Sequence, residues 1–324
     1  MLFAIGIVVV FFIYFTLPGP SPREDVSFGV TFSSRAARDL GLDPQEVLTA
    51  SFKDLGVKKV RIPVYWDSVE TVQGVYDYAD IDWQLTEAKR YQAEVILAIG
   101  QKVPRWPECF IPSWAKDDDA LRKERLVDFV AHTIDRYRSH SEIVMWQIEN
   151  EPFLKFGECP TIDPDLLDAE IVAAKKTDAS RPILTTDSGE LSLWIQAASR
   201  GDVFGTTLYR RIKKGDTYVT YPIGPNFFRF KEQLVRLFTQ QKNFIVIELQ
   251  AEPWANGSFR DVPLSEQWQT MDEKKFAENV YYARQVGFSD VYLWGVEWWY
   301  WLKMSQNHPE LWDAARKVFL GTSL

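Results

Sequence analysis

Histidine, cysteine and clusters of basic residues are scarce in this 324-residue chain. The three histidines are His132, His140 and His308, and no two of them have the spacing of metal ligands, so we expect no metal site built from histidine. A Ser-His-Asp or Cys-His mechanism is also disfavoured, because the chain has few histidines and cysteines. The net charge is -8 and there is no basic stripe, which argues against a nucleic-acid partner. Acid–base chemistry must therefore come mainly from the 45 Asp and Glu residues.

Length and composition fit one large domain that is rich in aromatic residues. A chain with 46% hydrophobic and 25% charged residues is ordinary for a globular protein with a large core. One barrel type routinely needs about 250 residues for a single domain. Aromatic residues make up 15% of the chain, with 13 Trp. Because the apolar faces of sugar rings lie flat on indole, this composition is typical of carbohydrate binders, although Trp also simply fills cores.

The N-terminal segment is predicted to stand apart from the fold. Residues 1–17 form an apolar run without charge, close to the shortest membrane span and to the core of a signal peptide. No basic residue precedes the run and no small-x-small site clearly follows it, so an uncleaved anchor is favoured over a cleaved signal or a buried helix. Residues 18–25 would then be a Pro-rich linker. Anchor and signal both place the main domain outside the cytoplasm.

From residue 26 to residue 324, short apolar runs alternate with amphipathic stretches. Near-continuous apolar runs are typical of strands that are buried on both faces. Eight such runs predict strands at 26–32, 58–64, 93–100, 142–149, 182–187, 203–209, 244–250 and 290–296. The stretches with helical periodicity are 44–55, 81–91, 121–137, 165–176, 230–240, 273–286 and 309–319.

Alternation of strand and helix predicts a parallel sheet, either closed into a (β/α)8 barrel or open and doubly wound. Two features favour the barrel. The end of the first strand reads GVTFSS and lacks the G-x-G-x-x-G turn that binds phosphate in doubly wound folds. Polar and aromatic residues crowd the C-terminal ends of the strands, where a barrel builds its active site. We therefore predict an α/β protein with a single TIM-barrel domain, residues 26–324.

Two glutamates follow apolar strands that face each other across the predicted barrel. The fourth strand runs into WQIENEP, which contains Glu151, and the seventh runs through FIVIE to Glu248. Because burying a carboxylate is costly, acids at such positions suggest that the function uses them. Retaining glycoside hydrolysis needs two carboxyl groups about 5–5.5 Å apart. One is the nucleophile and the other, with a raised pKa, is the general acid and base.

These segments resemble the clan A glycoside hydrolases, the barrel superfamily that includes cellulases and β-galactosidases. WQIENEP is similar to their Asn-Glu-Pro signature on the fourth strand, and VIELQ is similar to their nucleophile strand. Arg61 in VRIPVYW resembles the clan's second-strand arginine. Trp294 in YLWGVEWW resembles the tryptophan that would stack on the sugar in the subsite of the cleaved unit. The matches extend from residue 26 to residue 301, and their combination is specific.

The resemblance implies a role for each matching residue. Glu151 would be the general acid and base, and Glu248 would be the nucleophile. Asn150 would hydrogen-bond the 2-hydroxyl of the sugar. Arg61 and Tyr209 would keep Glu248 ionised and oriented, because a neighbouring cation lowers the pKa of a carboxyl group.

Two assignments have competitors within the sequence, and one further glutamate has two possible roles. Glu149 competes with Glu151 as the acid, and strand alternation would put both on the same side. The position directly after Asn favours Glu151. Glu252 competes with Glu248, but it precedes a proline and is expected in a loop. Glu297 would end the eighth strand, where it would either bind sugar hydroxyls or form a salt bridge.

The chain departs from the clan pattern because it has no His at its strand ends, and Gln101 or Lys102 after the third strand could stand in. Cys109 and Cys159 fall in the loops after strands three and four, which favours a disulfide between two active-site loops over free thiols. Five tryptophans expected in loops either form sugar subsites or pack in the core: Trp106, Trp114, Trp254, Trp298 and Trp299.

We therefore predict a retaining glycosidase that hydrolyses a β-linked oligo- or polysaccharide without a metal or organic cofactor. We expect an extracytoplasmic monomer whose partner is a carbohydrate substrate, and which is either membrane-anchored through residues 1–17 or secreted. Two alternatives would use the same site: a barrel that binds carbohydrate without turnover, and a transglycosylase.

Overall fold

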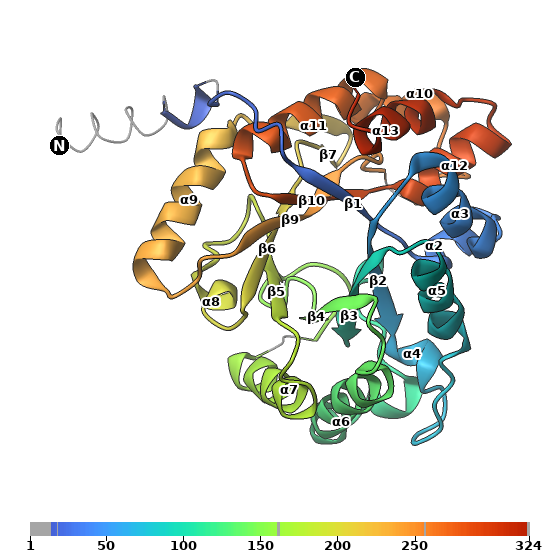
Figure 1. The fold of residues 1–324 in the computed structure, drawn as a ribbon, viewed down its shortest axis with the longest axis vertical. Coiled ribbons are helices and arrows are strands. Elements are labelled where there is room, and N and C mark those ends of the chain that lie inside the picture. The colour runs from blue at the N-terminus through green and yellow to red at the C-terminus, as the bar shows by residue number, and fades with distance from the viewer. Residues whose placement is uncertain (1–13, 18, 161–162, 256, 323–324) are drawn as a thin grey trace.

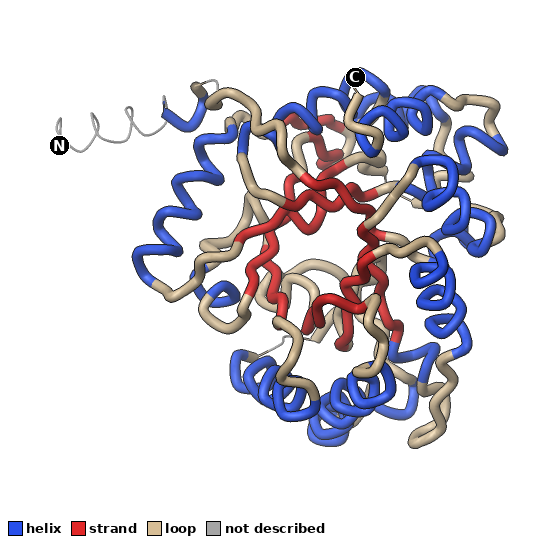
Figure 2. The backbone as a smooth tube through the Cα atoms, in the orientation of Figure 1, coloured by secondary structure: helices blue, strands red, loops and turns tan. Residues whose placement is uncertain are grey.

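Eight parallel strands form a closed ring at the centre of the computed structural model, which describes residues 14–17, 19–160, 163–255 and 257–322 (Figures 1 and 2). Around the ring the strands follow chain order, and the last pairs with the first. The (β/α)8 prediction is confirmed, and the open sheet is excluded. The strands are β1 (Ser27–Thr31), β2 (Lys59–Tyr65), β3 (Glu94–Gly100), β4 (Ile143–Ile148), β5 (Ile183–Asp187), β6 (Val203–Leu208), β9 (Phe244–Gln250) and β10 (Asp290–Trp294).

Helices surround the ring of strands on its outside (Figure 2). The seven predicted helical stretches all contain helix, and 273–286 has the predicted bounds. The helices are α2 (Ser34–Asp39), α3 (Pro44–Ala50), α4 (Trp66–Val69), α5 (Ala79–Arg90), α6 (Asp119–Tyr137), α7 (Pro164–Thr177), α8 (Ile195–Ala198), α9 (Pro225–Phe238), α10 (Leu264–Thr270), α11 (Glu273–Val286), α12 (Val296–Ser305) and α13 (Glu310–Phe319). Single turns of π-helix and 3-10 helix lie at Ser51–Leu55 and Ser113–Ala115.

Helix α12 was missed by the sequence analysis, and it corrects three placements. Its sequence is apolar on every side and has no amphipathic period, so it reads as the continuation of a strand. Gly295, with φ of 137°, ends the strand in a conformation that residues with a Cβ rarely adopt. Trp298 and Trp299 are therefore buried helical residues instead of loop residues, and Glu297 lies in the first turn of α12 instead of ending a strand.

A two-stranded antiparallel hairpin was also missed. It consists of β7 (Arg211–Lys214) and β8 (Thr217–Thr220) and lies in the connection between β6 and α9. Its strands have only four residues each and are polar, so they carry no apolar period.

The side chains of the barrel strands alternate between two layers. One set packs outward against the helices and forms the main core, as Val60, Ile62 and Val64 do on β2. The other set fills the interior of the barrel in a smaller apolar cluster of Ile96, Leu184, Val203, Ile245, Ile247 and Tyr292. Arg61 lies between two outward-facing neighbours on β2, so its side chain points into the barrel.

Strand β9 contains a β-bulge that changes this alternation. Val246 is opposite Val291 and Leu249 is opposite Leu293, so β9 has one residue more than β10 over this stretch. The pairing with β6 shows the same extra residue. Val246 and Leu249 face the outer core, and Ile247 faces the interior. The bulge lets the next residue, Glu248, also face the interior, as bulges beside active sites commonly do.

The described part of the N-terminal region lies on the barrel domain. The Phe15 ring is 5.5 Å from that of Phe227 on α9. Arg284 of α11 donates hydrogen bonds to the carbonyl oxygens of Arg23 and Glu24. Part of the expected linker therefore contacts the domain along α11.

Residues 1–13 and 18, on which most of the anchor or signal prediction rests, lie outside the described residues. Among the residues that are described, no helix is long and apolar enough to span a bilayer. The anchor thus stays a prediction.

The two cysteines are bonded to each other. The Cys109–Cys159 disulfide joins the loop after β3 to the loop after β4, with Cα atoms 5.2 Å apart. The predicted bond between two loops at the same end of the barrel is thereby confirmed.

We predict that this bond contributes substantially to stability. It joins residues separated by 50 positions, so replacing Cys109 and Cys159 by Ser should lower the free energy of unfolding by about 2–4 kcal/mol. Urea denaturation of the double variant measures the change, and reduced wild-type protein is the matched control. An unchanged urea midpoint would show that the disulfide does not stabilise the folded protein relative to the unfolded chain.

Candidate active site

Arg61 is the centre of a buried network at the C-terminal end of the barrel. Its Nη1 is 2.7 Å from Oε1 of Glu248, and its Nη2 is 2.7 Å from Oδ1 of Asn150. Its Nε donates to Oε1 of Gln147 at 2.8 Å. One guanidinium therefore links β2 to β9 and to the end of β4. Because all three acceptors are fixed in protein, the cost of burying this charge is offset by three directed bonds.

The second oxygen of Glu248 accepts a hydrogen bond from the Tyr209 hydroxyl at 3.0 Å. Burial, and then the negative charge of Glu248, raises the pKa of Tyr209 well above its usual value. The phenol therefore keeps its proton and stays a donor. The two oxygens of Glu248 thus face different donors, one of them cationic.

Glu151 lies close enough to Glu248 for the charge of Glu248 to act on it. Its Oε1 accepts a hydrogen bond from Thr207 Oγ1 at 3.2 Å, and its backbone N–H donates to Thr186 Oγ1 at 2.8 Å. Burial raises the pKa of Glu151 well above its usual value, and the charges of Glu248 and Glu108 raise it further. The protonated form of Glu151 therefore persists at higher pH than for an exposed glutamate.

The structure distinguishes Glu149 from Glu151. Strand β4 ends at Ile148, and both glutamates have positive φ, 59° and 44°, so the expected strand alternation does not extend to them. Oε1 of Glu149 accepts from the backbone N–H of Gln101 at 2.8 Å, and Oε2 accepts from that of Lys102 at 2.7 Å. Glu149 is thus fully engaged in holding the loop after β3.

The two residues expected to replace the missing histidines behave differently. The Lys102 Nζ donates to the carbonyl oxygens of Glu151 at 2.9 Å and Leu154 at 2.8 Å, so it fixes the loop that carries Glu151. The side chain of Gln101 is fully buried, and neither atom of its amide has a partner among the described residues. A free donor and a free acceptor therefore lie just beyond the end of β3.

Trp294 lies in a second cluster of charged residues. The guanidinium carbon of Arg105 is 4.3 Å from the centre of a Trp294 ring, and Nε1 of Trp294 donates to Glu252 Oε1 at 2.7 Å. Arg105 also pairs with Glu252 at 2.6 Å and with Glu297. The remaining oxygen of Glu297 accepts from the backbone N–H of Ser33. Of the two alternatives for Glu297, the salt bridge is the contact that the structure contains.

Arg105 and Glu108 are site residues that the sequence analysis missed. Both lie in the loop after β3, in the segment PRWPEC. Glu108 is 8% exposed, and its Oε2 has no partner among the described residues. Burial, followed by the charge of Glu248, raises the pKa of Glu108 to about 8. A loop has no period from which to infer the direction of a side chain, and the sequence analysis named only Trp106 and Cys109 in this segment.

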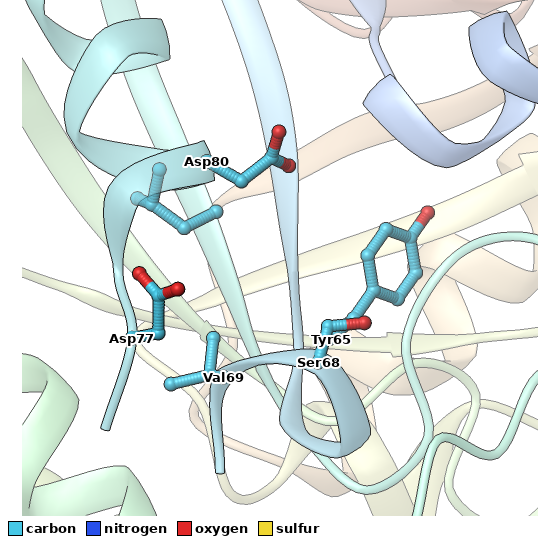
Figure 3. Close-up of a pocket in the computed structure, with 6 residues that line it drawn as sticks. Tyr65, Ser68, Val69, Asp77 and Asp80 are labelled. Atoms are coloured by element: carbon cyan, nitrogen blue, oxygen red, sulfur yellow. The ribbon is translucent and has the colours of Figure 1, made fainter. Parts of the chain in front are cut away.

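A separate small cavity of about 80 Å³ lies beside the barrel, between the end of β2, α4 and the start of α5 (Figure 3). Its wall contains none of the residues described above. Its lining residues are Tyr65, Ser68, Val69, Asp77, Asp80 and Ile81. Among the described parts of the chain, no three His, Cys, Asp or Glu side chains are grouped so that they could hold a metal ion.

A family model described as Cellulase (glycosyl hydrolase family 5) matches residues 27–189, half of the chain. The chain belongs to glycosyl hydrolase family 5. The predicted resemblance is confirmed at this level, and the chain is classed among enzymes that hydrolyse O-glycosyl bonds. No curated protein matches it.

Solved structures share the fold at low sequence identity. Exo-beta-1,4-mannosidase Op5Man5 from Opitutaceae bacterium strain TAV5 is 15% identical, with a TM-score of 0.58 over 83% of this chain and 51% of that chain. A GH5_18 protein from Bifidobacterium longum subsp. longum, in complex with Manβ1-4GlcNAc, is 15% identical, with a TM-score of 0.61 over 83% of this chain and 68% of that chain. This chain therefore spans about half the length of the first and two thirds of the second.

We predict that the Arg61–Glu248 pair is strongly coupled. Replacing Arg61 by Met leaves a buried carboxylate without its cation, so the free energy of unfolding should fall by about 3–5 kcal/mol. Adding Glu248→Gln removes the uncompensated charge and should recover part of this loss. Urea unfolding of the two single variants and the double variant measures the coupling. Additive effects of the two changes would show that the pair is not coupled.

Proposed function

We propose that this chain is a retaining β-glycosidase in which Glu248 is the nucleophile and Glu151 the general acid and base. The observation that carries the proposal is the contrast between the two carboxyl groups. Arg61 donates to one oxygen of Glu248 and Tyr209 donates to the other, which orients this carboxyl group. Burial and neighbouring negative charge favour the protonated form of Glu151. Two carboxyl groups with such different surroundings are the arrangement that acid-assisted nucleophilic attack requires.

The reaction then follows two displacements. A carboxylate oxygen of Glu248 bonds to the anomeric carbon while the glycosidic C–O bond breaks, and Glu151 gives its proton to the departing oxygen. In the second step Glu151, now ionised, takes a proton from water. The water oxygen attacks the anomeric carbon, and the bond to Glu248 breaks. Each step inverts the anomeric centre, so the product keeps the configuration of the substrate.

The surrounding residues would orient the sugar. Oδ1 of Asn150 accepts from Arg61, which turns the amide nitrogen of Asn150 away from Arg61, and this nitrogen would donate to the 2-hydroxyl. Trp294 would contact the sugar beside Arg105, which covers one face of a Trp294 ring. Glu297, whose oxygens bond Arg105 and Ser33, would act by positioning Arg105.

Two further features indicate which substrates to test first and in which compartment the protein would act. One structural neighbour is an exo-β-1,4-mannosidase and another is in complex with Manβ1-4GlcNAc, so β-1,4-linked mannosides are the first substrates to test. The Cys109–Cys159 bond indicates an oxidising compartment, which supports an extracytoplasmic location.

A nucleophile variant tests the proposal. Glu248→Gly should lower kcat for 4-nitrophenyl β-mannoside or β-glucoside by about 10⁴-fold or more. Azide fits the space left by the side chain and should restore turnover, giving the α-glycosyl azide. NMR of the products identifies the anomer. A wild-type product of inverted configuration would refute double displacement.

The pH profile tests the acid. Because burial and neighbouring negative charge raise the pKa of Glu151, its proton persists to higher pH than that of an exposed glutamate, and kcat/KM should fall as the pH rises through this raised pKa. Glu151→Gln should abolish this alkaline limb and slow substrates with poor leaving groups by about 10²–10⁴-fold. Substrates with a dinitrophenolate leaving group need no proton and should be slowed much less.

Glu149→Gln is the matched control, because Glu149 is a buried glutamate two residues away whose two oxygens accept from the backbone N–H groups of Gln101 and Lys102. This variant should keep the alkaline limb. If Glu149→Gln removes the limb and Glu151→Gln does not, then the acid has been assigned to the wrong residue.

A further inference from the structure

Four aromatic rings form a continuous row from solvent to Glu248. The Trp106 ring, in the loop after β3, is 6.1 Å from that of Phe156, in the loop after β4. Phe156 is 6.0 Å from Trp254, in the loop after β9, and Trp254 is 5.5 Å from Tyr209. Tyr209 in turn bonds Glu248. This aromatic row therefore has its inner end at the proposed nucleophile.

The outer end of the row is open to water. Trp106 is 63% exposed and Phe156 is 37% exposed, while Trp254 is half-buried. Exposure of neighbouring aromatic side chains to water is unfavourable. An exposed aromatic patch beside an active site is typical of a binding surface. The faces of the rings are uncharged and flat. They match the apolar C–H faces of neutral sugar rings.

The loops that carry the two outer rings are held together as one unit. The Cys109–Cys159 disulfide joins them, and the Glu158 N–H donates to the Pro107 carbonyl oxygen at 3.0 Å. Gly157 packs so closely that an added Cβ would be 2.6 Å from the same oxygen. The rings are therefore positioned before any ligand arrives, which lowers the entropy lost on binding.

The position of Glu151 indicates which part of a substrate would contact the aromatic row. Phe156 follows Glu151 by five residues in the same loop. Glu151 protonates the departing oxygen, so the leaving group lies on its side of the scissile bond. Trp294 and Arg105 form the separate cluster at the ends of β10 and β3 that would surround the sugar being cleaved.

We propose that the aromatic row binds the neutral sugar units on the leaving-group side of a β-linked oligosaccharide. This inference rests on the proposed function and narrows its substrate class. The chain would act on oligosaccharides in preference to glycosides with small leaving groups, and the disulfide would maintain this preference.

The test compares long and short substrates of the same sugar. The measured quantity is kcat/KM for mannotetraose divided by that for β-mannosyl fluoride, whose leaving group is too small to reach the row. Cellotetraose and β-glucosyl fluoride form a parallel pair. Trp106→Ala and Phe156→Ala should each lower this ratio about five- to tenfold, mainly through KM of the tetrasaccharide. Trp106→Phe should restore much of it.

Tyr281→Ala is the matched control, because Tyr281 is an aromatic residue of α11 that is 53% exposed and lies outside the row. Its ratio should equal that of the wild type. Cys159→Ser should lower the ratio in the same direction as the ring variants. If Trp106→Ala and Phe156→Ala leave the ratio unchanged, or lower both rates equally, then the row does not bind the leaving-group sugars.

Binding measurements separate failure of this inference from failure of the proposed function. Glu248→Gln cannot turn over by the proposed route, and calorimetric titration with mannotetraose and cellotetraose measures its affinity. The inference predicts a Kd about five- to tenfold higher when Trp106→Ala is added. This result would stand even if the wild type cleaved neither tetrasaccharide. Equal affinity with and without Trp106, or no binding of either probe, would overturn the inference.

Discussion

The buried ion pair between Arg61 and Glu248 is the interaction on which the rest of the candidate site depends. Neither side chain has more than slight contact with solvent, so each charge requires the other. Arg61 reaches its position because the alternation of strand β2 points its side chain into the barrel, toward the ends of β4 and β9. Its remaining donors bond Gln147 and Asn150. One cation thus fixes Glu248, the proposed nucleophile, and the amide of Asn150 relative to each other.

The pair in turn depends on a local irregularity in β9. In a regular strand, Ile247 facing the interior would force Glu248 to face the helices. The bulge turns Glu248 inward without moving Val246 and Leu249 out of the outer core. Around the Arg61–Glu248 pair, the loops supply further contacts that position the site residues. Lys102 and the disulfide position the chain around Glu151, and Arg105 joins Trp294 to two further acids.

Much of the fold followed from the sequence because a barrel of this kind is a repeated local pattern. Each of the eight predicted strands is a strand, and the predicted ends differ from the observed ends by at most two residues. Arg61, Asn150, Glu151, Tyr209 and Glu248 were predicted as site residues from motifs on or just after those strands. Hydrogen bonds connect all five, Glu151 through the Thr186 hydroxyl.

What could not be predicted lies where no period exists. The apolar sequence of α12 fits helix and strand equally, and only the conformation of Gly295 separates β10 from it. The bulge leaves no pattern in a uniformly apolar strand. Arg105 and Glu108 lie in a loop, where contact depends on a backbone path that local sequence does not encode. The contacts of Glu297 could not be predicted either, because its partners are more than a hundred residues away in the sequence.

The most direct test of the account is to trap the glycosyl-enzyme. Incubation with a 2,4-dinitrophenyl 2-deoxy-2-fluoro-β-glycoside slows the second displacement more than the first, so a covalent intermediate should accumulate. Mass spectrometry of the intact protein and then of its peptides locates the added sugar. The account predicts one sugar per chain, attached to Glu248. A label on Glu252, Glu108 or Glu151 would contradict it, and so would an active enzyme that never forms a covalent adduct.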